Sequence, residues 1–296
     1  MKTALVSIII PTYRRDTGLR RALESLPGQT WPNFEIIIVD DNADPGWNTR
    51  VMTIVDRFRT EYPHLPLIYI QNRENLGSAE TRNAGIRACS GGYICFLDDD
   101  DLYLPDRIAH QMTAMEKAGA DYSVTDLNLY NGQEKLVEVR KRDYITDEAQ
   151  LMKYHLMHHI TGTDTVMFRR DYLLRIGCFD PINVGDEFYL MAKAIKNGGK
   201  FLYVPGCQVK AYIHGGEDGL SGGQGKIDGE NQLFAYKQKY FADLDKKTVR
   251  YIHMRHHAVL AYANLRNGSY GRFLIEGMRA VAWEPAAAIK LLTGRV

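Results

Sequence analysis

The sequence lacks the features that mark several common classes of protein. It has only four cysteines, which form no CxxC pair and match no zinc-ligand spacing. We therefore expect Cys89, Cys95, Cys178 and Cys207 to be reduced and mostly buried, as in a cytosolic protein. The net charge is only +1, which disfavours a strongly basic nucleic-acid binder. No apolar run approaches the ~20 residues needed to span a bilayer.

The N-terminal stretch MKTALVSIIIPTYRR contains an apolar run that a signal peptide would also have. This run is short, ends at Pro11 and lacks a cleavage site of small residues, so we interpret it as a buried strand. The chain has 296 residues, of which 45% are hydrophobic and 25% charged. That length and composition are sufficient for a large globular core.

In the first half of the chain, apolar runs rich in β-branched residues alternate with amphipathic helical patterns. Such an alternation predicts parallel strands that helices cover on both faces. The expected strands are 5–10, 34–39, 66–70 and 93–97, and the expected helices are 16–26, 47–61, 78–89 and 104–117. The predicted fold class is therefore α/β, with a mostly parallel central sheet flanked by helices.

The second half is less regular. Strands are expected near 121–127, 164–169 and 200–204, with a helix at 186–197 and a polar stretch at 131–147. The segment from His214 to Gly229 is rich in glycine and is expected to be a mobile loop. Residues 230–296 are expected to form a helical C-terminal extension with a break at Pro285. No internal repeat occurs.

The charge is unevenly distributed. Residues 246–296 contain nine Lys or Arg against two Asp or Glu, a local net charge of +7. Two interpretations stay open: a solvated helical face, or a basic surface that contacts an anionic membrane or a partner.

Polar clusters follow each of the first four expected strands. They are Pro11 to Tyr13, Asp40 to Asp44, Asn72 to Gly77, and Asp98 to Asp101. Ligands of open α/β sheets bind beyond the carboxyl ends of the strands. We therefore expect all four clusters to converge on one binding crevice.

The four consecutive aspartates are the most specific of these signals. In an extended backbone the side chains alternate, so Asp98 and Asp100 would point to the same side. Two hard oxygen ligands on one side suit Mg²⁺ or Mn²⁺ held with substrate phosphates. The alternative is an exposed acidic turn in which Asp101 caps the next helix.

The other strand-end clusters also have two interpretations. Asp40, Asp41 and Asp44 could accept hydrogen bonds from a nucleoside, or could form a turn that leads into a helix. Tyr13 could stack on a base or pack within the core. Arg82, near the start of a helix, could bind a diphosphate or form a surface salt bridge.

Two further candidates lie later in the chain. Asp186 and Glu187 begin an expected helix, where one of them could act as a general base or both could simply stabilise the helix terminus. His214 precedes the glycine-rich segment and could bind a metal or phosphate, although most loop histidines do neither.

Five segments in this order resemble the inverting family 2 glycosyltransferases with a GT-A fold. They are VSIIIPTYRR, FEIIIVDDNADP, ENLGSAETRNAGI, GGYICFLDDDDLYLPDRI and VGDEFYLMAKAI. The resemblance covers roughly residues 4–215 and implies a GT-A catalytic domain over 1–215. Its nucleotide-binding half would span about 1–127 and its acceptor half about 128–215, followed by a flexible loop at 216–229 and the helical extension at 230–296.

The resemblance also implies roles for individual residues. Asp98 and Asp100 match a DXD-type metal-binding pair, and His214 matches a histidine that contacts the metal, Mn²⁺ or Mg²⁺. Asp186 matches the catalytic base, but the usual Glu-Asp order is reversed here, so Glu187 remains a competitor. The implied nucleotide contacts are Pro11, Thr12, Tyr13, Asp40, Asp41, Asn75, Arg82, Asp98 and Asp99.

The implied reaction moves a sugar from a nucleotide-diphospho-sugar to an acceptor hydroxyl with inversion. A UDP-sugar is the expected donor, and the expected acceptor is a glycan, a polyol phosphate or a lipid-linked molecule in cell-surface polymer synthesis. The expected location is cytoplasmic or peripheral on the cytoplasmic face of the membrane, with contact through the basic C-terminal helices.

Other functions remain as alternatives. A metal-dependent nucleotidyltransferase or phosphohydrolase would also use an aspartate cluster on a parallel sheet. A dehydrogenase is disfavoured because no GxGxxG follows the first strand. A non-catalytic sugar-nucleotide-binding or scaffold protein on the same fold is the main alternative of another class.

Overall fold

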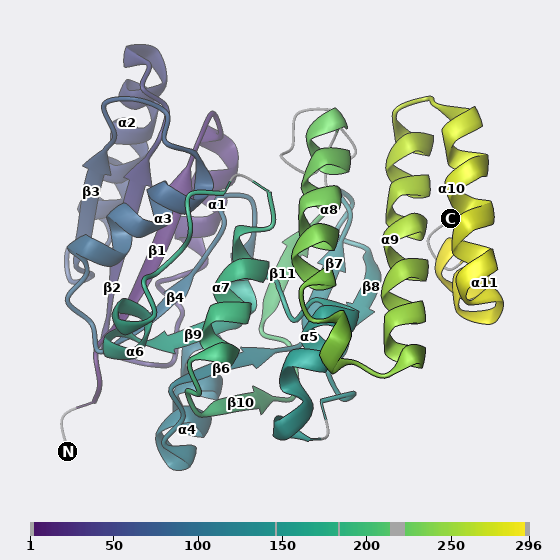
Figure 1. Ribbon diagram of the computed structural model, residues 1–296. Coiled ribbons are helices and arrows are strands. Elements are labelled where there is room, and N and C mark those ends of the chain that lie inside the picture. The colour runs from purple at the N-terminus through teal and green to yellow at the C-terminus, as the bar shows by residue number, and fades with distance from the viewer. Residues whose placement is uncertain (1–2, 146, 183, 214–222, 294–296) are drawn as a thin grey trace. The chain divides into compact units, whose positions relative to one another are not determined.

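The computed structural model describes residues 3–145, 147–182, 184–213 and 223–293 (Figure 1). The chain divides into two compact units. The first comprises Met1–Glu148 and Ile160–His214, and the second comprises Ala149–His159 and Gly215–Val296. Helix α5 (Leu151–His158), which the sequence patterns did not indicate, therefore belongs to the same unit as the C-terminal helices.

Within the described ranges of the first unit, seven strands form one sheet in the order β10-β6-β9-β4-β1-β2-β3. Neighbouring strands run parallel except β9, which is antiparallel to both β4 and β6. This sheet confirms the expected α/β class. Its strands are β1 (Val6–Thr12), β2 (Phe34–Asp40), β3 (Leu67–Gln71), β4 (Tyr93–Phe96), β6 (Tyr122–Thr125), β9 (Val166–Arg169) and β10 (Phe201–Val204).

Helices cover both faces of this sheet, as expected. The helices of the first unit are α1 (Asp16–Glu24), α2 (Pro45–Glu61), α3 (Gly77–Ala88), α4 (Arg107–Ala118), α6 (Arg170–Arg175) and α7 (Asp186–Lys196). Alternate residues of β1 point to opposite faces. Ile8 and Ile10 join the core that includes α1, α2 and α4, whereas Ile9 faces α3 on the other side. The apolar N-terminal stretch is thus a buried strand, as expected.

Helix α3 approaches the sheet closely because one of its residues has no side chain. A Cβ atom on Gly85 would lie 2.5 Å from Ile9 Cγ2 and 3.3 Å from a methyl group of Val39. Only glycine permits this approach, which fixes the height of α3 above β1 and β2. Arg82, about one turn earlier in α3, is held over the carboxyl ends of these strands as a result.

Helix α4 begins three residues later than expected. Leu104 and Pro105 were predicted to form its first turn, but their backbone atoms bond elsewhere. The Leu104 N–H donates to the Gln208 carbonyl, and the Pro105 carbonyl accepts from the Thr30 N–H. Ile108, Met112 and Met115 are fully buried on one face, as expected.

A second, smaller sheet of the first unit was not predicted. In the described residues its strand order is β5-β11-β7-β8. These strands lack clear patterns because they are short, and β8 exposes apolar and polar side chains alike. Part of the polar stretch expected at 131–147 is therefore a strand. The four strands are β5 (Leu102–Tyr103), β7 (Leu127–Tyr130), β8 (Leu136–Arg140) and β11 (Val209–Tyr212).

The second unit is helical wherever the structure describes regular elements. Besides α5 it contains α8 (Gly223–Gln238), α9 (Lys246–Arg266), α10 (Tyr270–Trp283) and α11 (Pro285–Thr293). The break at Pro285 is confirmed. Residues 223–229, which were expected in the loop, form the first part of α8, and residues 214–222 lie outside the described residues.

Two observations bear on the remaining expectations. All four cysteines lie in described ranges and are free thiols, with Cys89 and Cys95 buried and Cys178 and Cys207 half-buried. Among the described helices, none has the length and apolar character needed to cross a membrane.

Candidate active site

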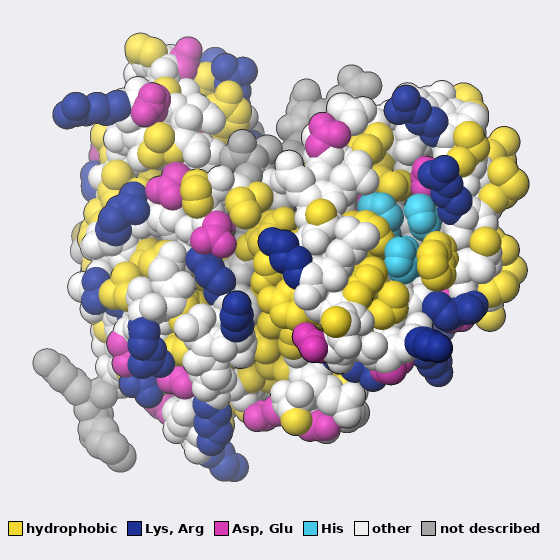
Figure 2. Space-filling model, viewed as in Figure 1, with side chains coloured by type: hydrophobic (Ala, Val, Ile, Leu, Met, Phe, Trp, Pro, Cys, Tyr) yellow, Lys and Arg dark blue, Asp and Glu magenta, His cyan; other side chains and the backbone are white. Residues whose placement is uncertain are grey.

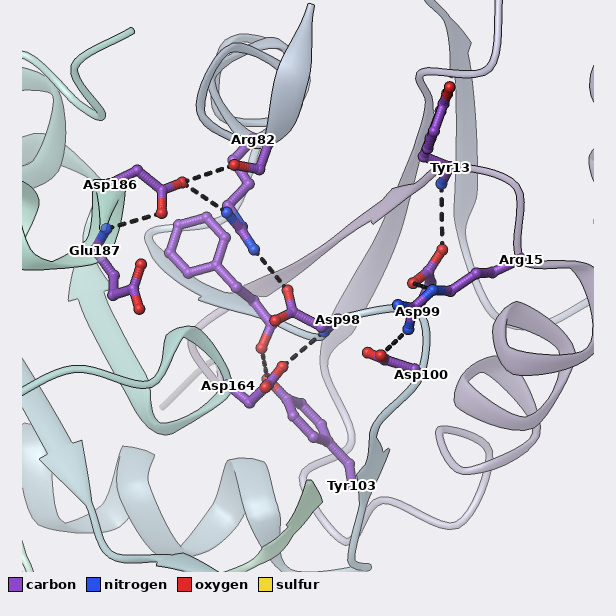
Figure 3. A network of polar contacts seen from close by, with 12 residues as sticks. Tyr13, Arg15, Arg82, Asp98, Asp99, Asp100, Tyr103, Asp164, Asp186 and Glu187 are labelled. Carbon is purple, nitrogen blue, oxygen red and sulfur yellow. Dashed lines mark hydrogen bonds and ion pairs between the residues drawn. The ribbon is translucent and has the colours of Figure 1, made fainter. Parts of the chain in front are cut away.

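The four aspartates form a turn at the end of β4. The Asp101 N–H donates to the Asp98 carbonyl over 3.1 Å, so the backbone is not extended here. The expected alternation of side chains is therefore wrong. Asp98 contacts Arg82, while Asp100 forms an ion pair with Arg15 (Figure 3).

Asp99 joins the β4 turn to the end of β1. Its carboxylate accepts a hydrogen bond of 2.8 Å from the Thr12 hydroxyl and one of 3.3 Å from the Tyr13 N–H. Burial raises the pKa of Asp99 to about 7. The position of this turn also depends on Gly18 of α1, because a Cβ there would lie 2.5 Å from the Asp99 carbonyl oxygen.

Asp98, Asp101 and Asp164 form a cluster of carboxylates. Their ligand atoms all lie within 4.8 Å of one another, and no other acidic or metal-ligating cluster of this kind occurs among the described residues. Burial raises the pKa of Asp164 to about 7 and that of Asp101 well above its usual range, and mutual repulsion adds to both. Clustered carboxylate oxygens that repel one another fit a divalent cation, which prefers oxygen ligands and would neutralise their charge.

The clustered carboxylates differ from the expected metal ligands: Asp101 and Asp164 accompany Asp98 in place of Asp100. Asp101 does not cap the next helix, since its carboxylate accepts from the Tyr212 N–H over 2.8 Å. Asp164 was not predicted; it lies in the 3₁₀ turn η2 (Thr163–Thr165), and its carboxylate accepts from the Asp98 N–H over 2.6 Å. His214 lies outside the described residues.

Arg82 connects this cluster to the start of α7. Its Nη2 lies 2.7 Å from Asp98 Oδ1, and its Nη1 lies 2.8 Å from Asp186 Oδ2. The side chain is only 7% exposed, so the alternative of a surface salt bridge is wrong. Its Nε has no hydrogen-bond partner among the described residues. Burial opposes its charge, but the carboxylates of Asp98 and Asp186 raise the pKa of Arg82 above its ordinary value.

The pKa values of Asp186 and Glu187 are shifted in opposite directions although the residues are adjacent. Burial alone would raise the pKa of Asp186, but the charge of Arg82 lowers it. The Ser78 hydroxyl and the Glu187 N–H also donate to the Asp186 carboxylate, over 3.2 and 3.0 Å. Burial and the Asp186 charge raise the pKa of Glu187 to about 8. These opposite shifts favour Asp186 as the ionised member of the pair and Glu187 as the protonated one.

Tyr13 is not a packing residue, because 43% of it is exposed. The Arg14 guanidinium lies 5.2 Å from the centroid of its ring. Arg14 has a positive φ of 53°, and its N–H donates to Asn42 Oδ1 over 2.6 Å. The segment after Pro11 and Thr12 therefore turns sharply and presents the Tyr13 ring to solvent, where an aromatic ligand can stack.

Asp40 acts within the protein. It is fully buried. Its carboxylate accepts hydrogen bonds from the Asn42 N–H and amide, from Asn48 and from the Tyr69 hydroxyl. These described partners supply four hydrogen bonds, the capacity of a carboxylate. This arrangement favours a positioning role for Asp40 over direct contact with a nucleoside.

Asp41 organises the loop after β3. Its carboxylate accepts from the Asn72 amide at 2.8 Å and from the Leu76 and Gly77 N–H groups, each at 2.9 Å. The Asn75 amide donates to the Asp41 carbonyl over 3.0 Å. The negative charge of Asp41 thereby stabilises the partial positive charge at the N-terminus of α3. Asp44 caps α2, since its carboxylate accepts from the Trp47 N–H; this confirms the turn interpretation for that residue.

These residues bring the ends of β1, β2, β3 and β4 together with the start of α7, as the convergence of polar clusters predicted. A family model described as "Glycosyl transferase family 2" matches residues 7–176. The chain belongs to glycosyltransferase family 2.

Known proteins similar to this family member include an uncharacterized glycosyltransferase of Haemophilus influenzae. It is 30% identical over 179 residues, which are 58% of this chain and 55% of that protein. The chain thus spans about half the length of this curated relative.

Solved structures share the fold. A Pyrobaculum calidifontis mannosyltransferase, in complex with GDP-Man and Mn²⁺, has a TM-score of 0.64 at 17% identity, covering 98% of this chain and 85% of its own. Residues 1–349 of S. aureus TarS, in complex with UDP, have a TM-score of 0.60 at 15% identity, covering 95% and 91%. The family member described here has the expected GT-A fold.

Sequence reasoning missed Asp164 and Arg15. Asp164 lies just before β9, and the antiparallel direction of β9 places that end beside the carboxyl end of β4. A polar residue preceding an antiparallel strand is the signal that would have found it, but the strand direction was not predictable. Arg15 was visible only as one of two arginines after PTY.

Proposed function

We propose that this chain transfers a sugar from a nucleotide-diphospho-sugar, with a UDP-sugar as the donor, to an acceptor hydroxyl with inversion at the anomeric carbon. The observation that carries this proposal is the Arg82 bridge, which holds Asp98 at the end of β4 and Asp186 at the start of α7. The Arg82 guanidinium thus holds both Asp98, which would face the donor, and Asp186, which would act as the base.

The donor would lie across the ends of the first four strands. The exposed Tyr13 ring offers a stacking surface for a pyrimidine base, with Pro11 and Thr12 shaping the same turn. Asp99, which accepts a hydrogen bond from the Thr12 hydroxyl, would contact the ribose. Asp40, Asp41 and Asn75 would hold the surrounding loops. The solved TarS fragment in complex with UDP, which shares this fold, supports the choice of nucleotide.

The cation, Mn²⁺ or Mg²⁺, would be held by Asp98 with Asp101 and Asp164. When bound, it would supply positive charge next to the leaving diphosphate. His214 remains a predicted further contact. Asp100, which the sequence motif also suggested, forms an ion pair with Arg15, and this favours the set of three over the Asp98 and Asp100 pair.

Asp186 would act as the general base, because the charge of Arg82 lowers its pKa and favours its ionised form, whereas the raised pKa of Glu187 favours the protonated form. It takes the proton of the acceptor hydroxyl while that oxygen attacks the anomeric carbon. The bond from this carbon to the diphosphate oxygen breaks, and the electron pair leaves with the nucleoside diphosphate. One displacement inverts the configuration.

The acceptor would be a glycan, a polyol phosphate or a lipid-linked molecule used in cell-surface polymer synthesis. Such acceptors are met on the cytoplasmic face of the membrane, where the basic C-terminal helices would contact anionic lipid. The local charge of +7 over 246–296 supports this part of the proposal.

A nucleotide-sugar screen tests the proposal. The protein is incubated with Mn²⁺ or Mg²⁺ and a panel of UDP-, TDP-, GDP- and CDP-sugars, and free nucleoside diphosphate is measured. We expect slow hydrolysis of one donor, lost in Asp98→Asn and Asp186→Asn. Asp56→Asn, a change of the same kind at an exposed position of α2, is the matched control and should retain the activity.

Each outcome of the screen separates two functions. Metal-dependent UDP binding by calorimetry without diphosphate release, even with added acceptors, would favour the non-catalytic sugar-nucleotide-binding protein. Release of pyrophosphate from nucleoside triphosphates instead would favour the nucleotidyltransferase. If UDP does not bind and no diphosphate or pyrophosphate is released, the proposal of a nucleotide site is overturned.

A further inference from the structure

Helix α10 exposes a row of apolar side chains on the side away from α9. Surface helices of globular proteins normally direct their apolar stripe toward the core. In α10 the inner side, toward α9, carries the buried Ala280 and Glu276, whose carboxylate lies 2.7 Å from His257 Nδ1 of α9. Trp283 also lies on this side, and its ring stacks on His253 of α9 at 4.1 Å between centroids. A second set of apolar side chains, all of them exposed, lies on the other side.

These outward side chains form one continuous surface, which we call the α10 stripe. At about 100° per residue, they fall within less than half of the helix circumference. Tyr270 is 68% exposed, Met278 65% and Leu274 60%. Figure 2 shows apolar side chains over α10 with basic ones nearby. The stripe consists of Tyr270, Leu274, Ile275, Met278 and Val281.

A contiguous exposed apolar surface of this kind marks an interaction site rather than ordinary surface variation. The charge at its edge indicates the kind of partner. Arg272 and Arg279 are exposed and follow the stripe along one margin, at about 200° and 180° from Tyr270 on the helical wheel. Lys290 of α11 is also exposed.

Carboxylates balance this positive charge only in part. Residues 246–296 contain only two, Glu276 and Glu284. Glu276 is paired with His257 and Arg279, and Glu284 is paired with Arg250 at 3.1 Å. A second copy of this chain, docked on the same surface, would bring the same excess of positive charge against itself. An anionic partner with an apolar layer is complementary to both features.

We propose that the α10 stripe lies in the surface of an anionic phospholipid membrane. The apolar side chains would enter the boundary between headgroups and acyl chains, while Arg272 and Arg279 would contact lipid phosphates. The 14 residues of α10 are fewer than the ~20 needed to span a bilayer, so the helix would lie parallel to the surface. Membrane binding by the stripe does not depend on the proposed function. Only its consequence, that the transferase meets a lipid-linked acceptor at this surface, rests on that function.

Vesicle flotation with the full-length protein tests the inference. The vesicles are phosphatidylcholine alone, or phosphatidylcholine with about one third phosphatidylglycerol. We expect about tenfold stronger partition onto the anionic vesicles, most of which is lost when NaCl is raised from about 0.1 M to about 0.5 M. Leu274→Glu with Met278→Glu should reduce partition about tenfold or more, because both charges would enter the apolar layer. Arg272→Gln with Arg279→Gln should remove the preference for anionic lipid.

The matched control is Leu174→Glu, the same kind of change at a 41% exposed position of α6 in the first unit, which should bind vesicles as the unaltered protein does. Circular dichroism melting checks that each variant is folded. Equal binding to both vesicle types, or unchanged binding by the stripe variant, would overturn the inference. So would a dimer in analytical ultracentrifugation that the stripe variant dissociates, together with absent vesicle binding. Flotation needs no nucleotide sugar, so its failure is distinct from a failure of donor turnover.

Discussion

Arg82 and Asp186 form an ion pair that is buried at both ends. Nη1 of Arg82 lies 2.8 Å from Oδ2 of Asp186, and the two side chains are 7% and 6% exposed. The same guanidinium reaches Asp98 at 2.7 Å. One cation of α3 thus sets the separation between the carboxylate after β4 and the carboxylate that begins α7.

Removal of this cation should destabilise the protein. Arg82→Met leaves two carboxylates without their countercharge, and loss of one partner of a buried ion pair costs about 3–5 kcal/mol. Urea unfolding at pH 7 measures the change. Arg87→Met, in the same helix but with an exposed side chain that lies 3.9 Å from Glu80, should change the free energy of unfolding by less than about 0.5 kcal/mol. Equal effects of the two variants would show that the buried pair contributes nothing special.

The raised pKa of Glu187 predicts a pH dependence of stability. Its pKa is about 8 in the folded protein, above the ordinary value of 4.5, so folding takes up a proton between these values. This contribution is fully present below about pH 4.5 and is lost as the pH rises through about 8. Since one pKa unit corresponds to about 1.4 kcal/mol, the loss should amount to a few kcal/mol.

Urea midpoints at intervals between pH 5 and pH 9 test this linkage. The midpoint should fall across this range in the unaltered protein, and Glu187→Gln should reduce the fall because glutamine does not ionise. A parallel pH dependence in both proteins would mean that Glu187 titrates normally in the fold.

The metal-binding set can be distinguished by two aspartate variants. Mn²⁺ at about one hundred times its dissociation constant should raise the stability by about 2.7 kcal/mol, and EDTA should reverse this. Asp164→Asn should abolish the increase, whereas Asp100→Asn, which alters the pair with Arg15, should retain it. The opposite result would favour the Asp98 and Asp100 pair that the sequence motif suggested.

The same site should bind metal more tightly at higher pH. Burial raises the pKa of Asp164 to about 7, and only the ionised carboxylate binds a cation. The apparent Mn²⁺ affinity, measured by calorimetry, should therefore increase between about pH 6 and about pH 8. A flat profile would contradict the participation of Asp164.

Nucleotide stacking on Tyr13 predicts a selective loss of binding. Tyr13→Ala should weaken UDP binding about tenfold, equivalent to about 1.4 kcal/mol, whereas Tyr13→Phe should leave it nearly unchanged because the ring is kept. The exposed position implies little effect on folding. Tyr270→Ala, at a more exposed position in the C-terminal unit, is the control that should bind UDP normally. Calorimetry measures all three.

The sequence was informative about local order. The β-branched runs predicted β1, β2, β3 and β4, and their alternation with helices predicted that the polar ends of these strands would meet. Asp44 was recognisable as a possible turn residue before α2, because a side chain that accepts a nearby N–H needs only a few neighbouring residues. The family motifs added the expectation that Asp186 begins the last helix of the site.

The arrangement of the aspartates depended on long-range contacts. Asp98 and Asp101 converge because the chain turns after β4, and Asp164 joins them because β9 runs antiparallel beside that strand. Neither the turn after β4 nor the direction of β9 produces a periodic pattern of apolar residues in the sequence. The short strands β5 and β11 were missed for the same reason, since their partners lie far away along the chain. Strands β7 and β8 pair with each other locally, but β8 exposes apolar and polar side chains alike and so shows no alternation.

By itself, the sequence determined which residues share a face of each helix and which polar residues end each parallel strand, because these follow from the backbone repeat alone. Only the tertiary structure decided that Arg82 is buried between two carboxylates and that one row of apolar side chains on α10 is left exposed. Both features depend on which element packs against the residue or helix in question. A periodic pattern shows which residues share a face but not which element covers that face.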